Sequence, residues 1–111
     1  MSEQRPPVHL GPAGRRLWRA VLAGYRLAAT ERAILQAGCE ALDRQAEARA
    51  LIDAEGLIIE GRYGPRAHPA LAIERDARLA LVRTLRALGV RAGHEGVTRS
   101  NLTSFGRGRA S

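Results

Sequence analysis

One interruption constrains the fold of this chain more than any other feature. Residues 56–70 read GLIIEGRYGPRAHPA and separate two long stretches whose apolar residues recur at helical spacing. Gly56 is suited to end the first of these helices as its C′ residue. The apolar run at 57–59 is mostly β-branched and too short for another helix. The interruption therefore predicts a small β-hairpin at about 57–64.

Turn-forming and helix-starting residues complete this segment. Gly61 and Gly64 permit a tight turn, and Tyr63 fits a return strand. His68 is interpreted as a turn or cap residue rather than a catalyst, and Pro69 suits the N1 position of a new helix. An isolated two-stranded hairpin is marginal in water. We therefore expect it to lie against the helices or against a neighbouring subunit.

Three helices are predicted around this hairpin. The first runs from about Gly14 to Arg26, and its apolar face includes Trp18 and Tyr25. The second runs to about Glu55 and includes Gly38, which a close helix–helix approach would explain. Its expected N-cap is Thr30, followed by Glu31 in the first turn. The third runs from Pro69 to Leu88, where Gly89 stops it.

The predicted fold class is mainly α, with three helices in the protomer and a hairpin between the second and the third. We expect a flexible lead-in at 1–13, a helical domain at 14–89 and a basic disordered tail at 90–111. The ordered core is small for a lone domain, so a homo-oligomer is expected. The candidate interface residues are large apolar side chains on the helices: Trp18, Tyr25, Ile34, Ile52 and Leu79.

Positive charge is concentrated at the two ends of the chain. The formal net charge is +7, and all 18 basic residues are arginine. Residues 1–26 carry +4, residues 27–89 carry zero and residues 90–111 carry +3. Basic ends on a neutral body are typical of proteins that touch nucleic acid or another polyanion. Solubility alone is the alternative explanation.

No arrangement for catalysis or metal binding is evident, so the chain is predicted to be a non-enzyme without metal or cofactor. The three histidines are scattered, and Cys39 has no neighbouring thiol or histidine. Cys39 lies on an apolar stripe and is most simply a small core residue. A single cysteine favours a reducing, intracellular environment, and no segment is long and apolar enough for a membrane span.

A helix-turn-helix DNA reader was a further alternative for residues 14–55. In that motif the second helix enters the major groove. Here the exposed face of the second helix carries acids that phosphates would repel: Glu31, Glu40, Asp43 and Glu47. A transcription regulator of this type is therefore disfavoured, whereas DNA contact through the first helix and the tails remains open.

The chain resembles a family of short phage terminase small subunits. The resemblance rests on GRRLWRAVLAGYRLAATERAILQAGCEALDR, then EGLIIEGRYGPRAHPAL, then a helix ending LRALGV, over about residues 14–90. The features that carry it are spread along the helices and the hairpin: Leu17–Trp18, Tyr25, Glu31, Leu35, Cys39, Asp43, Gly56, His68–Pro69 and Leu88–Gly89.

The resemblance implies a role in viral DNA packaging in the host cytoplasm. Small terminase subunits form rings, engage double-stranded viral DNA and regulate a large subunit that carries the ATPase and nuclease. Our hypothesis is that arginines at both ends contact DNA phosphates without strong sequence readout: Arg15, Arg16, Arg19, Arg26, Arg107 and Arg109. The alternative is that these arginines pair with acids of a neighbouring subunit.

A second function remains open at this stage. A small oligomeric scaffold or adaptor that binds only protein would also have basic ends, which would meet an acidic partner surface. Such a protein would have negligible DNA affinity, so a DNA-binding measurement separates the two functions.

Overall fold

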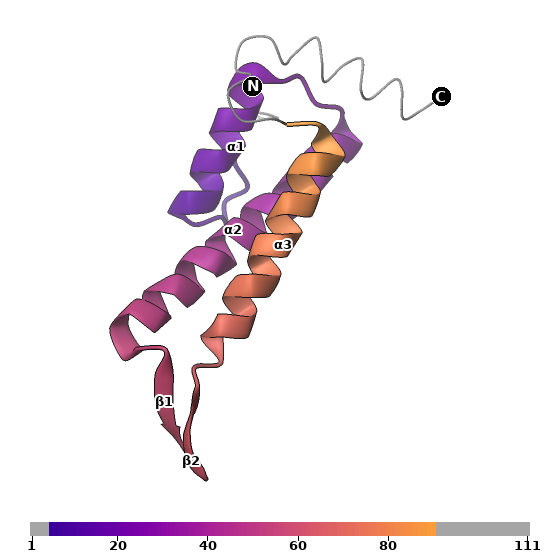
Figure 1. Cartoon of the computed structure of the whole chain (residues 1–111). Coiled ribbons are helices and arrows are strands. Elements are labelled where there is room, and N and C mark those ends of the chain that lie inside the picture. Colours follow the sequence, from indigo (N-terminus) through magenta and orange to yellow (C-terminus); the bar gives the residue numbers. More distant parts are fainter. Residues whose placement is uncertain (1–4, 91–111) are drawn as a thin grey trace.

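The computed structural model describes residues 5–90, and these form three helices and one hairpin (Figure 1). This confirms the predicted mainly helical architecture. The order of elements is α1 (Pro12–Gly24), α2 (Ala29–Glu55), β1 (Ile58–Gly61), β2 (Gly64–Ala67) and α3 (Ala70–Leu88). The predicted 90–111 tail lies outside the described residues except for Val90.

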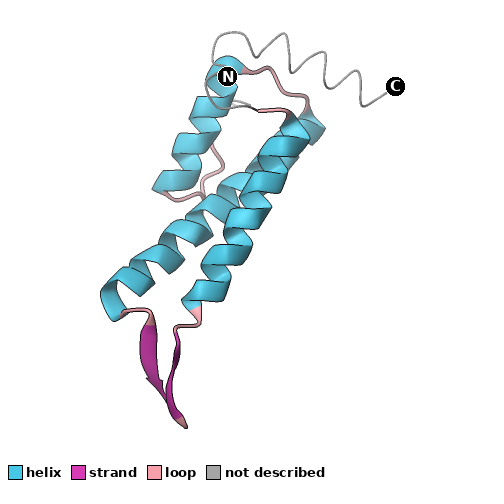
Figure 2. Cartoon of the chain, in the orientation of Figure 1, coloured by secondary structure: helices cyan, strands magenta, loops and turns pink. Residues whose placement is uncertain are grey.

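The two long helices form an antiparallel pair, because the hairpin reverses the chain and α3 runs back along α2 (Figure 2). Gly38 of α2 lies directly against Thr84 of α3. A Cβ atom built on Gly38 would lie 2.4 Å from the Thr84 methyl carbon. This confirms the prediction of a close approach at Gly38, since only glycine lets the two helices come so near.

The shorter helix α1 packs against α2 at the end far from the hairpin (Figure 1). Its apolar face forms the main core together with α2 and the end of α3. The buried members of this core come from all three helices and the segments around α1: Leu10, Trp18, Val21, Tyr25, Leu27, Leu35, Cys39 and Leu88. A smaller cluster of Ala48, Ile52 and Ala70 lies nearer the hairpin.

The segment before α1 is held against the protein from Leu10 onward. Leu10 is only 2% exposed, and α1 begins at Pro12 rather than at the expected Gly14. Proline suits the first turn of a helix, because its missing N–H would have no partner there. The expected mobile lead-in therefore does not extend to residue 13: within 5–13, the last residues belong to the core and to α1.

The start of α2 differs from the prediction. The helix begins at Ala29, and the residue that caps it is Ala28 rather than Thr30. The Glu31 carboxylate accepts the Ala28 N–H at 2.8 Å, which completes one half of a capping box. Glu31 thus lies in the first turn as expected, but its carboxylate performs the capping that we had assigned to the Thr30 hydroxyl.

The start of α3 depends on His68. Helix α3 begins at Ala70, so Pro69 is its N-cap rather than N1. The His68 ring is buried, and its Nδ1 accepts the Ala70 N–H at 2.9 Å while Nε2 lies 2.6 Å from a Glu55 carboxylate oxygen. Since Nδ1 is the acceptor, Nε2 carries the proton and donates to Glu55. His68 is therefore a cap residue, as expected, and it also joins the end of α2 to the start of α3.

The hairpin exists but is displaced along the sequence from the predicted 57–64. Strand β1 pairs with β2 from Ile58↔Ala67 to Gly61↔Gly64, so Tyr63 lies in the turn and not in the return strand. Pro65 is tolerated in β2 because this strand lies at the edge of the sheet. The hairpin projects from the end of the α2–α3 pair instead of lying against the helices (Figure 1).

Candidate nucleic-acid interface

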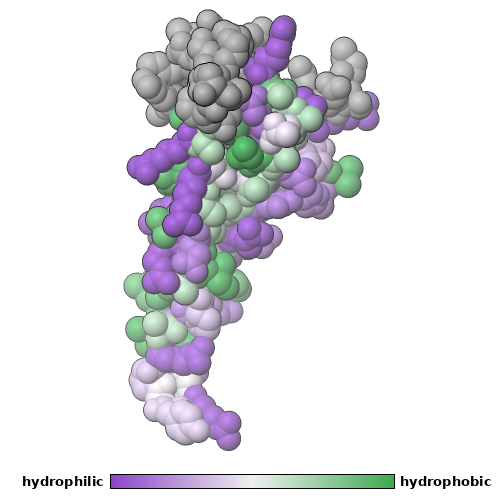
Figure 3. Space-filling view, turned by 90° about the vertical axis from the view of Figure 1, so that its right-hand side faces the viewer, coloured by the Kyte–Doolittle hydropathy of each residue, from purple (hydrophilic) through white to green (hydrophobic). Residues whose placement is uncertain are grey.

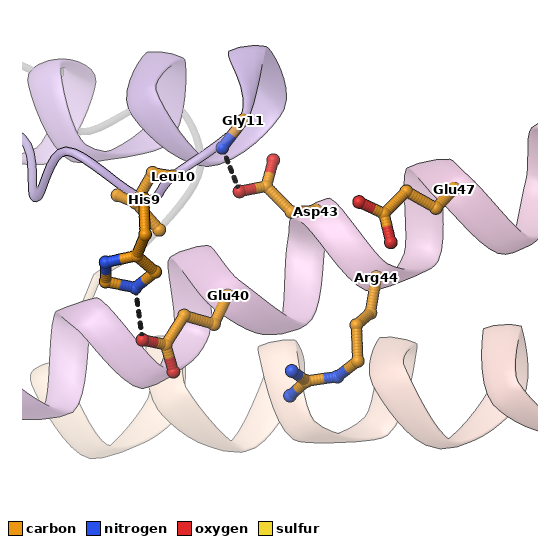
Figure 4. A pocket seen from close by; sticks show the side chains of 7 residues that line it. All are labelled: His9, Leu10, Gly11, Glu40, Asp43, Arg44 and Glu47. Carbon is orange, nitrogen blue, oxygen red and sulfur yellow. Dashed lines mark hydrogen bonds and ion pairs between the residues drawn. The ribbon is translucent and has the colours of Figure 1, made fainter.

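An aspartate of α2 fixes the start of α1. The Asp43 carboxylate accepts two backbone N–H groups, from Gly11 at 2.6 Å and from Gly14 at 2.7 Å. Figure 4 shows the contact with Gly11. These are free N–H groups of the first turn, and a negative charge there also complements the helix dipole. A Cβ on Gly14 would lie 2.5 Å from Asp43 Oδ2 and 2.8 Å from the Cys39 carbonyl oxygen. Glycine at position 14 is thus required for this contact.

A second contact ties the same segment to α2. His9 Nε2 lies 2.7 Å from a Glu40 carboxylate oxygen (Figure 4), and the Gln36 amide also donates to Glu40. The hydrogen bond with His9, followed by that from Gln36, lowers the pKa of Glu40. An open hollow of about 300 Å³ lies beside these residues.

These contacts change the interpretation of the acids on α2. We had interpreted Glu40 and Asp43 as part of a solvated face, whereas both bind the segment that leads into α1. The sequence contains a signal for this that we missed: Gly11 and Gly14 lie on either side of Pro12–Ala13, at the start of a helix that has no side-chain cap of its own. The helix-turn-helix alternative is weakened further, because part of this face of α2 is covered.

The exposed arginines of α1 lie on the side of the helix opposite its buried residues. Arg16 and Arg19 are exposed on α1, and Arg26 is exposed just after it. Within residues 5–90 none of the three takes part in an ion pair, and α1 contains no acid. Their guanidinium groups are therefore available to an anionic partner.

Arg15 differs from the other three. Its side chain is half-buried, and its guanidinium donates to the backbone carbonyl of Leu10. Arg15 thus helps to hold the segment before α1 and is less available to a partner than Arg16 or Arg19. Arg107 and Arg109 lie outside the described residues.

The candidate oligomer-interface residues fall into two groups. Trp18, Tyr25 and Ile52 are buried inside the protomer, so their apolar surface is already covered by the chain itself. Ile34 is half-buried beside the main core, and Leu79 of α3 is 49% exposed. Of the five, Leu79 offers the most surface to a second copy.

The described part of the chain contains neither an exposed cysteine nor a cluster of metal-binding side chains. Burial, followed by the negative charges of Asp43 and Glu40, raises the pKa of the Cys39 thiol to about 12. The thiol therefore stays protonated near neutral pH and acts as a small core residue. In residues 5–90 no group of three or more His, Cys, Asp and Glu side chains is placed to hold a metal ion. No helix of the same region is long and apolar enough to cross a membrane.

Comparison with known proteins identifies the family to which the chain belongs. No curated protein and no solved structure matches the chain significantly. A family model described as the small subunit of phage terminase matches residues 15–95, which include most of α1 and all of α2, the hairpin and α3. Because this match covers most of the sequence, the chain belongs to the phage terminase small-subunit family, whose members generally serve as non-catalytic components of viral DNA packaging.

Proposed function

We propose that this chain binds double-stranded viral DNA through the outer face of α1 during packaging. The observation that supports the proposal is the set of three exposed guanidinium groups at Arg16, Arg19 and Arg26, which form no ion pair within residues 5–90. DNA phosphates are the complementary partner, and contacts to phosphate carry little sequence information.

The packing of α1 supports this role, because a fixed helix presents its charges at lower entropic cost than a mobile one. Trp18 and Val21 anchor the inner face of α1 in the core, and Asp43 holds its first turn. Arg15 reinforces the same segment through the Leu10 carbonyl. Arg107 and Arg109 would add further phosphate contacts from outside the described residues.

In this proposal the chain is non-catalytic and acts in the host cytoplasm as a homo-oligomeric ring. The ring engages DNA and regulates the ATPase and nuclease of the terminase large subunit. Exposed apolar side chains such as Leu57, Ile58 and Leu79 are candidates for contacts with other copies or with the large subunit. We infer this from membership of the family together with these exposed surfaces.

The test is DNA affinity measured by fluorescence anisotropy on a labelled duplex, from low to physiological salt. The variant Arg16→Gln/Arg19→Gln removes two phosphate contacts per bound protomer. It should weaken binding and reduce the slope of log affinity against log salt by about 1.8, because each contact contributes about 0.9. Arg15 is left intact, since its guanidinium holds the Leu10 carbonyl.

The matched control is Arg49→Gln/Arg75→Gln, which removes the same charge from two arginines that already pair with Asp53 and Asp76. The control should bind DNA nearly as the native protein does. Equal affinity of the α1 variant and the control at low salt would refute the assignment to α1.

An adaptor that binds only protein is the second candidate function. Leu57 and Ile58 favour it, because both are exposed apolar residues at the start of the hairpin. In that case the native protein would show no DNA affinity even at low salt, while it would still bind the large subunit.

A further inference from the structure

The tip of the hairpin presents two turn residues well away from the helices. Gly61 pairs with Gly64, so Arg62 and Tyr63 form the two-residue turn. Gly64 takes a φ of +117°. Among the described residues only glycines take a positive φ. This glycine absorbs the unusual backbone geometry, so the two turn residues keep ordinary conformations.

Arg62 and Tyr63 form one unit at this tip. The Tyr63 side chain is 95% exposed, and the Arg62 guanidinium carbon lies 5.9 Å from the centre of its ring. This is the geometry of a cation–π contact, which orders both side chains while most donor groups of the guanidinium stay free. The exposed ring is therefore held in place and available to a partner, and tyrosine is enriched at interfaces.

Arg66 of β2 adds a second guanidinium near the tip. Arg66 pairs with Ile59, yet its Cγ and Cδ atoms lie 2.9 and 2.6 Å from the position where a Cβ on Gly61 would be. Its aliphatic arm therefore crosses the open surface of Gly61, next to the turn. Glu60 is the nearest acid in the sequence, but it neighbours Ile59 in β1 and so faces the opposite side of the ribbon from Arg66.

Charge and shape together suggest the partner. Neither Arg62 nor Arg66 takes part in an ion pair within residues 5–90. In Figure 3 the projecting end ranges from near-white to purple and shows none of the green of hydrophobic residues. The tip is narrow and convex, so it offers no groove in which a peptide could lie, whereas the major groove of DNA admits a two-stranded β-ribbon.

We propose that this hairpin tip, formed by Arg62, Tyr63 and Arg66, is a second contact site for duplex DNA. The two guanidinium groups meet phosphates at the edges of a groove, and the Tyr63 ring packs against sugars and bases inside it. The identity of the partner rests on the proposed function, but the residues are different. They lie at the opposite end of an elongated molecule of 54 × 28 × 24 Å (Figure 1).

The experiment compares tip variants with the native chain in the anisotropy assay on a labelled duplex. For Arg62→Gln/Arg66→Gln, the loss of affinity between 50 and 200 mM salt should be about tenfold smaller than for the native protein, because two phosphate contacts are gone. Tyr63→Ala should bind about tenfold more weakly, because the apolar contact between its ring and the groove is lost. Tyr63→Phe keeps the ring and should bind as the native protein does.

The control is again Arg49→Gln/Arg75→Gln, and far-UV circular dichroism confirms that each variant is folded. Tip variants that bind DNA as this control does would overturn the inference, even if the α1 variant loses affinity as proposed. Loss of binding to the large subunit with unchanged DNA affinity would also overturn it and would assign the tip to a protein partner. An α1 variant with native affinity beside weakened tip variants would refute the α1 assignment alone.

Discussion

Asp43 shows how one side chain of a long helix can position a neighbouring helix. Its two carboxylate oxygens accept the N–H groups of Gly11 and Gly14, which α1 has no side chain of its own to satisfy. The missing Cβ atoms of both glycines make room for the carboxylate. A surface acid in the sequence is therefore a structural residue in the protein.

We expect Asp43→Ala to lower the free energy of unfolding by about 1–2 kcal/mol, the usual cost of losing a helix cap. The measurement is urea denaturation followed by Trp18 fluorescence, since this tryptophan is buried between α1 and the core. Glu47→Ala is the matched control, because Glu47 lines the same hollow and is exposed. A loss of stability as large in the control would contradict a specific capping role for Asp43.

At the scale of elements, each helix begins where a side chain accepts a backbone N–H group. Asp43 caps α1, Glu31 caps α2 and His68 caps α3. All three residues belong to the pattern by which the chain resembles terminase small subunits. Their presence in that pattern thus has a physical explanation in helix termination rather than in chemistry on DNA.

Gly38 and Thr84 provide the test of how closely α2 and α3 must approach. Alanine is the better helix former, so Gly38→Ala would stabilise a free helix by about 1 kcal/mol. In this protein the new methyl group would overlap Thr84, and we expect a net loss of about 1–3 kcal/mol instead. The measurement is again urea denaturation.

Adding Thr84→Ala to Gly38→Ala removes the methyl and hydroxyl groups that the new side chain meets. The double variant should therefore recover part of the stability that the single variant loses. A single variant more stable than the native protein would show that the helices separate at no cost at this position.

At the scale of the whole molecule, the protomer is long and leaves apolar side chains uncovered. Its dimensions are 54 × 28 × 24 Å, and several exposed apolar residues lie on or next to α2, the hairpin and α3: Leu51, Leu57, Ile58, Ile73, Leu79 and Val82. Leu79 and Val82 are three residues apart on α3 and therefore adjoin, and adjoining exposed apolar side chains are typical of an interface. This supports the expectation that copies of the chain associate.

We predict that multi-angle light scattering after gel filtration gives a discrete mass of many subunits rather than the 12.0 kDa of one chain. Leu79→Glu should reduce that mass, since it places a charge on the exposed face of α3. Ala50→Glu introduces the same charge at an exposed position of α2 and provides the comparison. A native protein that elutes as a stable monomer at high concentration would contradict a preformed ring.

Local chemistry in the sequence was sufficient to predict the elements of this fold. Helical periodicity predicted all three helices, and the stop at Gly56 and at Gly89 follows from the positive φ that both residues adopt. The hairpin was predicted from its glycines and its β-branched run. Its bounds were wrong because strand pairing, and not propensity, set Arg62 and Tyr63 as the turn.

Contacts between residues far apart in the chain could not be read in the same way. Asp43 meets Gly14 across 29 positions, and Trp18 and Tyr25 are buried in the protomer although both were predicted to lie at an oligomer interface. Periodicity identifies which side of a helix is apolar, but it does not specify which surface covers that side. That outcome depends on the packing of all three helices together, because burial and the satisfaction of backbone groups are properties of the assembled core.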